Sequence, residues 1–243
     1  METKIERDSV ILNIALPKGR LLPHIVPLLK SVGINCDEVT ESSRRLVLMD
    51  ERSNTRLFLM RPADVLTYVE QGACDVGIVG KDLILEERRD VCELVDLGFG
   101  FCRFVLAAPK EVAEKGLPGR GSIRVATKFP HIAGEYFQRK GIRAEIIKLH
   151  GSVELAPLAG LAEMIVDITS TGQTLAENNL VVLDEIATAT ARLVANRVSF
   201  RLKSERINSL VSKIQGTLAR VQGTPTEAGE GDQNANLVGA GIS

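Results

Sequence analysis

Short apolar runs alternate with amphipathic stretches from residue 9 to about residue 218, and the two spacings together leave few folds open. Runs of strand length separated by segments with helical spacing are typical of α/β proteins, in which helices connect parallel strands. The sequence therefore predicts an α/β fold with mostly parallel sheets. The candidate strands are Val10–Leu16, Leu46–Leu48, Leu57–Met60, Val76–Val79, Val105–Ala108, Ile123–Ala126, Ala144–Lys148, Met164–Ile168, Val181–Leu183 and Arg192–Asn196.

Helix signals fill the intervals between these runs. The segment Pro62–Gly72 opens with proline in its first turn and closes with glycine, as helices often do. Apolar residues recur with helical spacing in Leu21–Lys30, in His131–Lys140 and in Ser204–Leu218. We therefore expect these four segments to be helices.

Two segments are predicted to cross between lobes. Val95–Phe104 is rich in glycine and aromatic residues, and a second crossing is expected near Asp184–Thr190. The sequence thus predicts one lobe made of residues 1–102 and 190–220, and a second lobe inserted at 103–189. Two crossings imply a hinge, and ligands of two-lobed α/β proteins usually bind between the lobes, at the carboxyl ends of strands.

Composition favours a globular protein that binds small molecules. Hydrophobic residues make up 44% of the chain and the net charge is -1, so no basic field indicates nucleic acid. The charged N-terminus and the lack of a long apolar run predict a cytoplasmic protein with no membrane segment. The four cysteines lack the spacing of a metal knuckle. The polar, glycine-rich residues 221–243 are predicted to be a disordered tail.

The segment Asp167–Leu175 has the composition of a phosphate-binding loop. It reads Asp-Ile-Thr-Ser-Thr-Gly-Gln-Thr-Leu and follows the apolar run Met164–Val166. A glycine lets the backbone approach a ligand, and hydroxyls and the N–H groups of a following helix can bind an anion. Asp167 can accept hydrogen bonds from a sugar or help to hold a magnesium ion. A polar turn that caps the helix is the alternative.

Cationic residues follow three strand ends of the first lobe. They are found in Pro17-Lys-Gly-Arg20, at Arg61, and in Gly80-Lys81-Asp82. Lysine or arginine beside a glycine at a strand-helix junction suits a polyphosphate. Each also has a plainer interpretation: a basic turn before a helix, an arginine paired with a surface acid, and a glycine turn with a solvated lysine.

Two charged residues follow strands of the second lobe. Lys128 comes after the strand Ile123–Ala126, and Glu154 comes after Ala144–Lys148. Glu154 and Asp167 can bracket a ribose, although carboxylates at loop starts often cap helices instead.

Other polar residues are expected to have structural or solvent-exposed roles. His24 is expected to pack within an apolar helix, and the charge run Glu86–Asp90 is expected to be a solvated face. His131 and His150 have no paired serine or cysteine nucleophile nearby in the sequence, which disfavours a catalytic triad.

Six segments, in order, resemble the ATP phosphoribosyltransferase family. The resemblance extends from about residue 10 to residue 218 and is closest to the short form, because the chain ends before the histidine-binding regulatory domain of the long forms. The segments are Leu16-Pro-Lys-Gly-Arg-Leu21, Arg61-Pro-Ala-Asp-Val65, Asp75-Val-Gly-Ile-Val-Gly-Lys-Asp82, Val125-Ala-Thr-Lys-Phe-Pro130, Lys148-Leu-His-Gly-Ser-Val-Glu-Leu-Ala-Pro157 and Asp167-Ile-Thr-Ser-Thr-Gly-Gln-Thr-Leu175.

The resemblance implies a fold, a reaction and a set of site residues. The fold is two-lobed, like that of type II periplasmic binding proteins, and the reaction condenses ATP with phosphoribosyl pyrophosphate, with Mg²⁺, to phosphoribosyl-ATP and pyrophosphate. Asp167 and Glu154 are the implied catalytic residues, and no direct ligand of Mg²⁺ is predicted. The phosphoribosyl pyrophosphate set is Asp167, Ile168, Thr169, Ser170, Thr171, Gly172, Gln173 and Thr174. The ATP and pyrophosphate set is Leu16, Lys18, Gly19, Arg20, Arg61, Gly80, Lys81 and Lys128.

The resemblance also implies partners. Short forms need a regulatory subunit similar to histidyl-tRNA synthetase, so a homodimer within a hetero-oligomer is expected. Two other functions remain open on the residues alone. A two-lobed protein can bind a small molecule without catalysis, and a phosphoribosyltransferase can act on another base.

Overall fold

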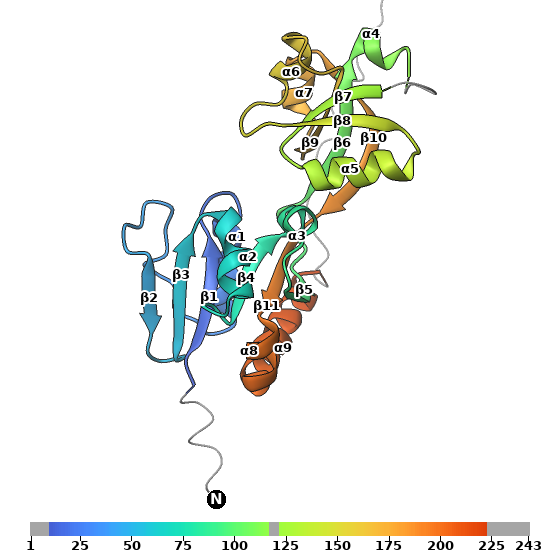
Figure 1. Ribbon diagram of the computed structural model, residues 1–243. Coiled ribbons are helices and arrows are strands. Elements are labelled where there is room, and N and C mark those ends of the chain that lie inside the picture. The colour runs from blue at the N-terminus through green and yellow to red at the C-terminus, as the bar shows by residue number, and fades with distance from the viewer. Residues whose placement is uncertain (1–9, 117–121, 223–243) are drawn as a thin grey trace, which may run out of the picture.

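The computed structural model describes residues 10–116 and 122–222, and it contains two β-sheets with helices around each (Figure 1). The first sheet has six strands in the order β2-β3-β1-β4-β11-β5, and we call it with its helices the first lobe. Its strands are β1 (Leu12–Pro17), β2 (Val47–Asp50), β3 (Thr55–Met60), β4 (Val76–Gly80), β5 (Cys92–Asp96) and β11 (Ala191–Ala195). Its helices are α1 (Leu22–Ser31), α2 (Pro62–Glu70), α3 (Lys81–Glu87), α8 (Arg197–Leu202) and α9 (Ser204–Gln222).

The second sheet has five strands in the order β10-β6-β9-β7-β8, and we call it with its helices the second lobe. Its strands are β6 (Cys102–Pro109), β7 (Ser122–Thr127), β8 (Arg143–Lys148), β9 (Met164–Thr169) and β10 (Leu180–Ala189). Its helices are α4 (Lys110–Ala113), α5 (Pro130–Arg139), α6 (Leu155–Leu158) and α7 (Gln173–Glu177). Figure 1 shows the two lobes one above the other, with α3 between them.

Both sheets are mixed, so the prediction of mostly parallel sheets was wrong. Among the strands that the structure describes, five of the nine pairings are antiparallel. The antiparallel partners include β6, β10 and β11, which carry the chain between the lobes. A strand that leaves one lobe and a strand that returns to it run in opposite directions, which local hydrophobic patterns do not reveal.

Several predicted boundaries change. The glycine-rich segment 95–104 is partly strand, because β5 ends at Asp96 and β6 begins at Cys102, and β5 was not predicted. The expected crossing near residues 184–190 is mostly the strand β10. Helix α9 extends to Gln222, so residues 221 and 222 are helical rather than tail. The rest of the predicted tail lies outside the described residues.

Parallel strands bring the predicted loops to common sheet edges. In the first lobe β1 pairs with β3 and β4, and Pro17 at the end of β1 lies opposite Met60 at the end of β3. In the second lobe β7 pairs with β8 and β9, and Thr127 at the end of β7 lies opposite Val166. The residues that follow these strands therefore share one edge in each lobe.

Asn196 links strand β11 to two helices of the first lobe. Its side-chain oxygen accepts hydrogen bonds from the N–H groups of Val198 and Ser199 in α8, and its amide nitrogen donates to the carbonyls of Val69 and Glu70 in α2. The side chain is buried. One side chain therefore satisfies helix-end groups of two helices.

Asn196→Ala is expected to lower the free energy of unfolding by about 2–4 kcal/mol, because a cap is lost and buried carbonyls lose their donor. Chemical denaturation measures this loss. Asn35→Ala is the matched control, since Asn35 is exposed and its side chain makes one local hydrogen bond, to the Asp37 N–H. A loss for Asn196→Ala no larger than that for Asn35→Ala would contradict the double role.

Candidate functional site

Lys18 and Arg61 lie on the wall of one cavity at the carboxyl edge of the first lobe. The cavity has a volume of about 670 Å³ and is lined mainly by apolar groups, including Phe58 and Tyr68. The Lys18 N–H donates to the Met60 carbonyl at 2.8 Å, which fixes the loop after β1 to the end of β3. An apolar wall that also carries two cations and one acid, Asp64, suits a base that bears phosphates.

The Pro17–Arg20 loop is held by residues from the segment after α1. The Lys18 ammonium donates to the Ser43 carbonyl at 2.8 Å, and the Gly19 N–H donates to Glu41 Oε1 at 2.7 Å. Gly19 has a φ of +93°, a backbone conformation that glycine adopts without strain. Leu16 is fully buried, so its side chain belongs to the core and only its backbone can reach a ligand.

The third loop of the first lobe brings Arg20 beside Asp82. Burial raises the pKa of the Asp82 carboxyl, and the nearby Arg20 charge lowers it. A Cβ at Gly80 would overlap Asp82 Oδ1, so a larger residue there would require the Asp82 side chain to turn away. Asp82 was placed in the Gly80-Lys81-Asp82 turn from the sequence, but no role at the site was assigned to it.

Lys81 already has a partner in the first lobe. Its ammonium pairs with Glu93 of β5, which also lies 3.6 Å from the Arg192 guanidinium. Because β5 was not predicted, this ion pair was not predicted either. Binding a polyanion at Lys81 therefore requires the Glu93 contact to be shared or exchanged.

Asp167 is the most buried charged residue of the second-lobe edge. It is 5% exposed at the carboxyl end of β9, and its Oδ1 accepts from the Ile168 N–H at 2.8 Å. Lys128 Nζ is 3.8 Å from Asp167 Oδ2, which brings together two predicted site residues. Burial raises the pKa of Asp167, and the charge of Glu154 raises it further, while Ile168 and Lys128 lower it.

Glu154 is not a helix cap. It directly precedes α6, yet its side chain makes no capping hydrogen bond, and it is partly buried near Asp167. Two carboxylates and one ammonium therefore lie near each other at this edge. That leaves excess negative charge where a cationic group can bind.

The loop after Asp167 is organised by its own hydroxyls. Thr169 Oγ1 accepts from the Gly172 N–H at 2.8 Å, and Thr171 Oγ1 accepts from the Gln173 N–H at 3.3 Å. Gly172 has a φ of +81°, which favours glycine there. Helix α7 has only five residues, so its dipole adds little to anion binding, and the hydroxyls of the loop are donors that a ligand can use.

The remaining loop residues differ in whether their side chains are available to a ligand. Ser170, Thr171 and Thr174 are exposed, whereas the Gln173 side chain donates to Glu177 Oε1 at 2.8 Å along the helix. A ligand that binds Gln173 must therefore replace its contact with Glu177 or the contact of its N–H with Thr171. The sequence-predicted residues fall into two groups, one on each lobe, and Lys128 belongs with the second-lobe group.

The described residues contain no cluster of three or more His, Cys, Asp or Glu that could hold a metal ion alone. Mg²⁺ usually needs only one or two carboxylates when substrate phosphates supply the other ligands. Asp167 and Glu154 fit that requirement. No helix within the described ranges has both the length and the hydrophobicity to cross a membrane.

Two other sequence expectations change. His24 is exposed and stacks on Phe99 with ring centroids 5.3 Å apart, so it is not packed inside α1. Glu86 is 6% exposed and is not part of a solvated face. All four cysteines are free thiols, and three of them are buried.

Comparison with known proteins shows the family of this chain. Residues 61–216 match the HisG family, described as ATP phosphoribosyltransferase. The chain is 51% identical over 216 residues to the ATP phosphoribosyltransferase of Desulfitobacterium hafniense (strain Y51), covering 86% of this chain and 97% of that protein.

Solved structures extend the comparison to the fold. A chain of the ATP phosphoribosyl transferase (HisG:HisZ) complex from Thermotoga maritima superposes with a TM-score of 0.73 at 40% identity, covering 86% of this chain and 99% of that one. The periplasmic VFT2 domain of Bordetella pertussis BvgS has a TM-score of 0.54 at 11% identity, with 90% and 96% covered, and shows the fold alone. The expected two-lobed, periplasmic-binding-protein-like fold is confirmed, and the expected short form agrees with the HisG:HisZ likeness. The chain belongs to the HisG family of ATP phosphoribosyltransferases.

Proposed function

We propose that this chain condenses ATP with phosphoribosyl pyrophosphate to give phosphoribosyl-ATP and pyrophosphate, the first step of histidine biosynthesis. The family supports the reaction. One structural observation supports its location: the second-lobe edge places the buried Asp167 carboxylate beside Glu154, Lys128 and a hydroxyl-rich loop. That set combines acceptors for a sugar with donors for a phosphate.

The reaction joins adenine N1 to the anomeric carbon of the ribose. The N1 lone pair forms the new C–N bond, the bond to pyrophosphate breaks, and its electron pair leaves with pyrophosphate. The ribose becomes positively charged in the transition state. Asp167, desolvated in the protein, then gains a cation beside it, which lowers the barrier. No strong base is needed, so positioning supplies the remaining catalysis.

The loop after Asp167 is assigned to phosphoribosyl pyrophosphate. Thr169 holds the loop by accepting from Gly172, and its hydroxyl proton is free to turn toward a phosphate oxygen. Thr171 and Thr174 are exposed and can donate to the 5-phosphate. Ile168, Ser170 and Gln173 complete the loop.

The first-lobe loops are assigned to ATP and to the leaving pyrophosphate. Lys18 and Arg61 line the cavity proposed for the nucleotide. Gly19 and Gly80 let the backbone come close to phosphates, while Arg20 and Lys81 supply charge to the leaving group. Lys128 faces the same group from the second lobe.

Asp167 and Glu154 are the residues proposed to hold Mg²⁺ together with substrate phosphates. When bound, Mg²⁺ stabilises the charge that collects on pyrophosphate. The protein's own part is to hold both carboxylates at the second-lobe edge, beside the ribose.

Assembly, domain limits and location complete the proposal. Within the described residues, we assign 10–101 and 190–222 to the first lobe and 102–116 and 122–189 to the second, with the hinge between them. The likeness to a chain of a HisG:HisZ complex supports a hetero-oligomer. The proposed arrangement is a homodimer of this chain together with a histidyl-tRNA-synthetase-like regulatory subunit. The proposed location is the cytoplasm.

Ultraviolet absorbance tests the function directly. The protein is mixed with ATP, phosphoribosyl pyrophosphate and Mg²⁺, with and without the regulatory subunit. A new chromophore is expected, because N1 substitution changes the adenine ring. No change in either mixture would indicate a binding protein. Activity only with another base would indicate a different phosphoribosyltransferase.

Thr171→Ala and Thr174→Ala are each expected to raise KM for phosphoribosyl pyrophosphate, by about 5- to 150-fold, since a hydrogen bond to a charged group contributes roughly 1–3 kcal/mol. Steady-state kinetics measures the effect. Thr188→Ala is the control, because Thr188 is exposed and belongs to neither proposed binding set, so its KM should change little. An unchanged KM in both threonine variants would remove the loop from the site.

A further inference from the structure

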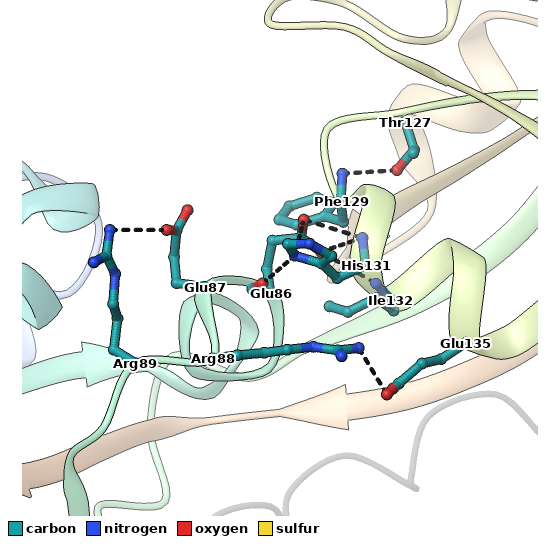
Figure 2. A network of polar contacts seen from close by, with 9 residues as sticks. All are labelled: Glu86, Glu87, Arg88, Arg89, Thr127, Phe129, His131, Ile132 and Glu135. Carbon is teal, nitrogen blue, oxygen red and sulfur yellow. Dashed lines mark hydrogen bonds and ion pairs between the residues drawn. The ribbon is translucent and has the colours of Figure 1, made fainter.

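The N-terminus of α5 is capped by a residue from the other lobe. Pro130, the first residue of α5, has no N–H, and the N-cap residue Phe129 makes no side-chain cap. The next two N–H groups, of His131 and Ile132, both donate to the Glu86 carboxylate at 3.1–3.2 Å (Figure 2). Glu86 lies on α3 of the first lobe.

This contact suits the electrostatics of α5. The helix has ten residues and no acidic residue in its first turn, so its positive end lacks a countercharge of its own. Glu86 supplies that charge from a buried position. The His131 ring adds a contact of 2.7 Å between Nδ1 and the Glu86 carbonyl oxygen.

Helix α3 is fixed to both lobes around Glu86. On the first-lobe side, Glu70 of α2 accepts from the Asp90 N–H at 2.9 Å and pairs with Arg89 at 3.1 Å. On the second-lobe side, Leu85 packs against an apolar cluster that includes Phe104 and Phe129. Arg88 and Glu135 form an outer, more exposed pair at 2.6 Å.

The capped helix begins two residues after Lys128. The loop between β7 and α5 is short, and the Phe129 N–H donates to Thr127 Oγ1 inside it. At its start Lys128 reaches Asp167 Oδ2 at 3.8 Å. A shift of the first turn of α5 therefore moves the loop that holds Lys128 against the proposed ribose carboxylate.

We propose that Glu86 is a positioning residue for phosphoribosyl transfer: it fixes α5 and the Lys128 loop from the opposite lobe, so that lobe orientation and the Lys128–Asp167 pair are set together. This rests on the proposed function of the second-lobe edge. Glu86 itself touches neither substrate. It acts through the two backbone amides of α5.

The test compares three variants of the full chain, with the regulatory subunit present. Glu86→Ala should lower kcat/KM for phosphoribosyl pyrophosphate by about 10- to 100-fold, as expected for misplacement by an ångström or less, with KM for ATP less affected. Glu86→Gln keeps the shape and an accepting oxygen and should lose less. If Glu86→Ala does not fold, the kinetic constants of Glu86→Gln test the proposed positioning role instead. Glu87→Ala is the control, because Glu87 is exposed and its ion pair with Arg89 is long, at 3.8 Å.

Hydrogen exchange provides a readout apart from activity. The amides of His131 and Ile132 should exchange faster in Glu86→Ala than in wild type or Glu87→Ala. Wild-type kinetic constants in folded Glu86→Ala, or in Glu86→Gln if only that variant folds, would overturn the proposal. So would an equal loss for both substrates accompanied only by a lower Tm. If wild type makes no phosphoribosyl-ATP and calorimetry shows no binding of phosphoribosyl pyrophosphate, the proposed function fails instead.

Discussion

Asp167→Asn is expected to lower kcat by about 100- to 1000-fold, in the range found when one preorganised electrostatic contact to a transition state is removed. The reason is the position of the carboxylate, buried at the end of β9 beside Lys128 and Glu154. Asparagine keeps the shape and an oxygen for the Ile168 N–H, so only the charge is lost. Single-turnover kinetics at saturating substrates measures the chemical step. A kcat near wild type would remove Asp167 from catalysis.

The same substitution is expected to stabilise the fold at neutral pH. Burial raises the pKa of Asp167 in the folded state, so its charged form is less favourable there than in the unfolded chain. The stability that its protonation contributes is fully present below the unfolded pKa, which is about 3.9, and is lost as the pH rises through the folded pKa. Asp167→Asn should therefore have a higher Tm than wild type at pH 7. The difference should vanish at low pH.

Asp184→Asn is the matched control, with the opposite sign. The hydrogen bond from Tyr136, followed by that from Lys140, lowers the pKa of the Asp184 carboxyl. Its contribution to stability is present above the unfolded pKa and is lost as the pH falls through the folded pKa. Asp184→Asn should thus lower Tm at pH 7 and leave kcat unchanged. A lower Tm for Asp167→Asn at pH 7 would contradict the inferred cost of burying the charged Asp167 carboxylate.

Asp75→Ala is expected to lower the free energy of unfolding by about 2–5 kcal/mol, because the partly buried Lys203 ammonium and the Asn13 N–H lose their shared acceptor. The Asp75 side chain is 4% exposed, and its Oδ2 accepts from Lys203 Nζ at 2.7 Å and from the Asn13 N–H at 2.8 Å. These contacts connect Lys203, which lies between α8 and α9, to the starts of β1 and β4. Chemical denaturation measures the loss.

Asp75 lies at the edge of the first sheet opposite the edge that carries the proposed ligand loops. Asp75 precedes β4, whereas the ligand loops follow the strands. The folded Asp75→Ala enzyme should therefore keep its kcat. Asp37→Ala is the control, since its pair with Lys30 is exposed and such pairs contribute about 0–1 kcal/mol. A loss from Asp75→Ala as small as that control would show that the buried pair stabilises little.

The site loops were predictable because they follow parallel strands. Strands β1, β3 and β4 end at one edge, and β7 and β9 end at another, so residues after them meet. Apolar runs reveal such strands, and glycines and charges mark their ends. This is why Lys18 and Arg61 share a cavity and Lys128 reaches Asp167.

Strand direction and long-range partners were not predictable in the same way. Strand β5 alternates weakly, with Val95 its only buried residue, and so it was hidden in a glycine-rich segment. Glu86 lies in a run of charges that resembles a solvated face, yet its partners are the backbone amides of residues 131 and 132. No side-chain pattern records such partners. The Lys81–Glu93 pair was missed for the same reason, since it depends on where β5 lies.

A crystal structure with phosphoribosyl pyrophosphate and an unreactive ATP analogue tests the assignment of the two loops most directly. We expect the 5-phosphate at the hydroxyls of residues 169–174, the ribose beside Asp167, and the nucleotide against Lys18 and Arg61. Phosphoribosyl pyrophosphate bound elsewhere, with the loop after Asp167 empty, would contradict it.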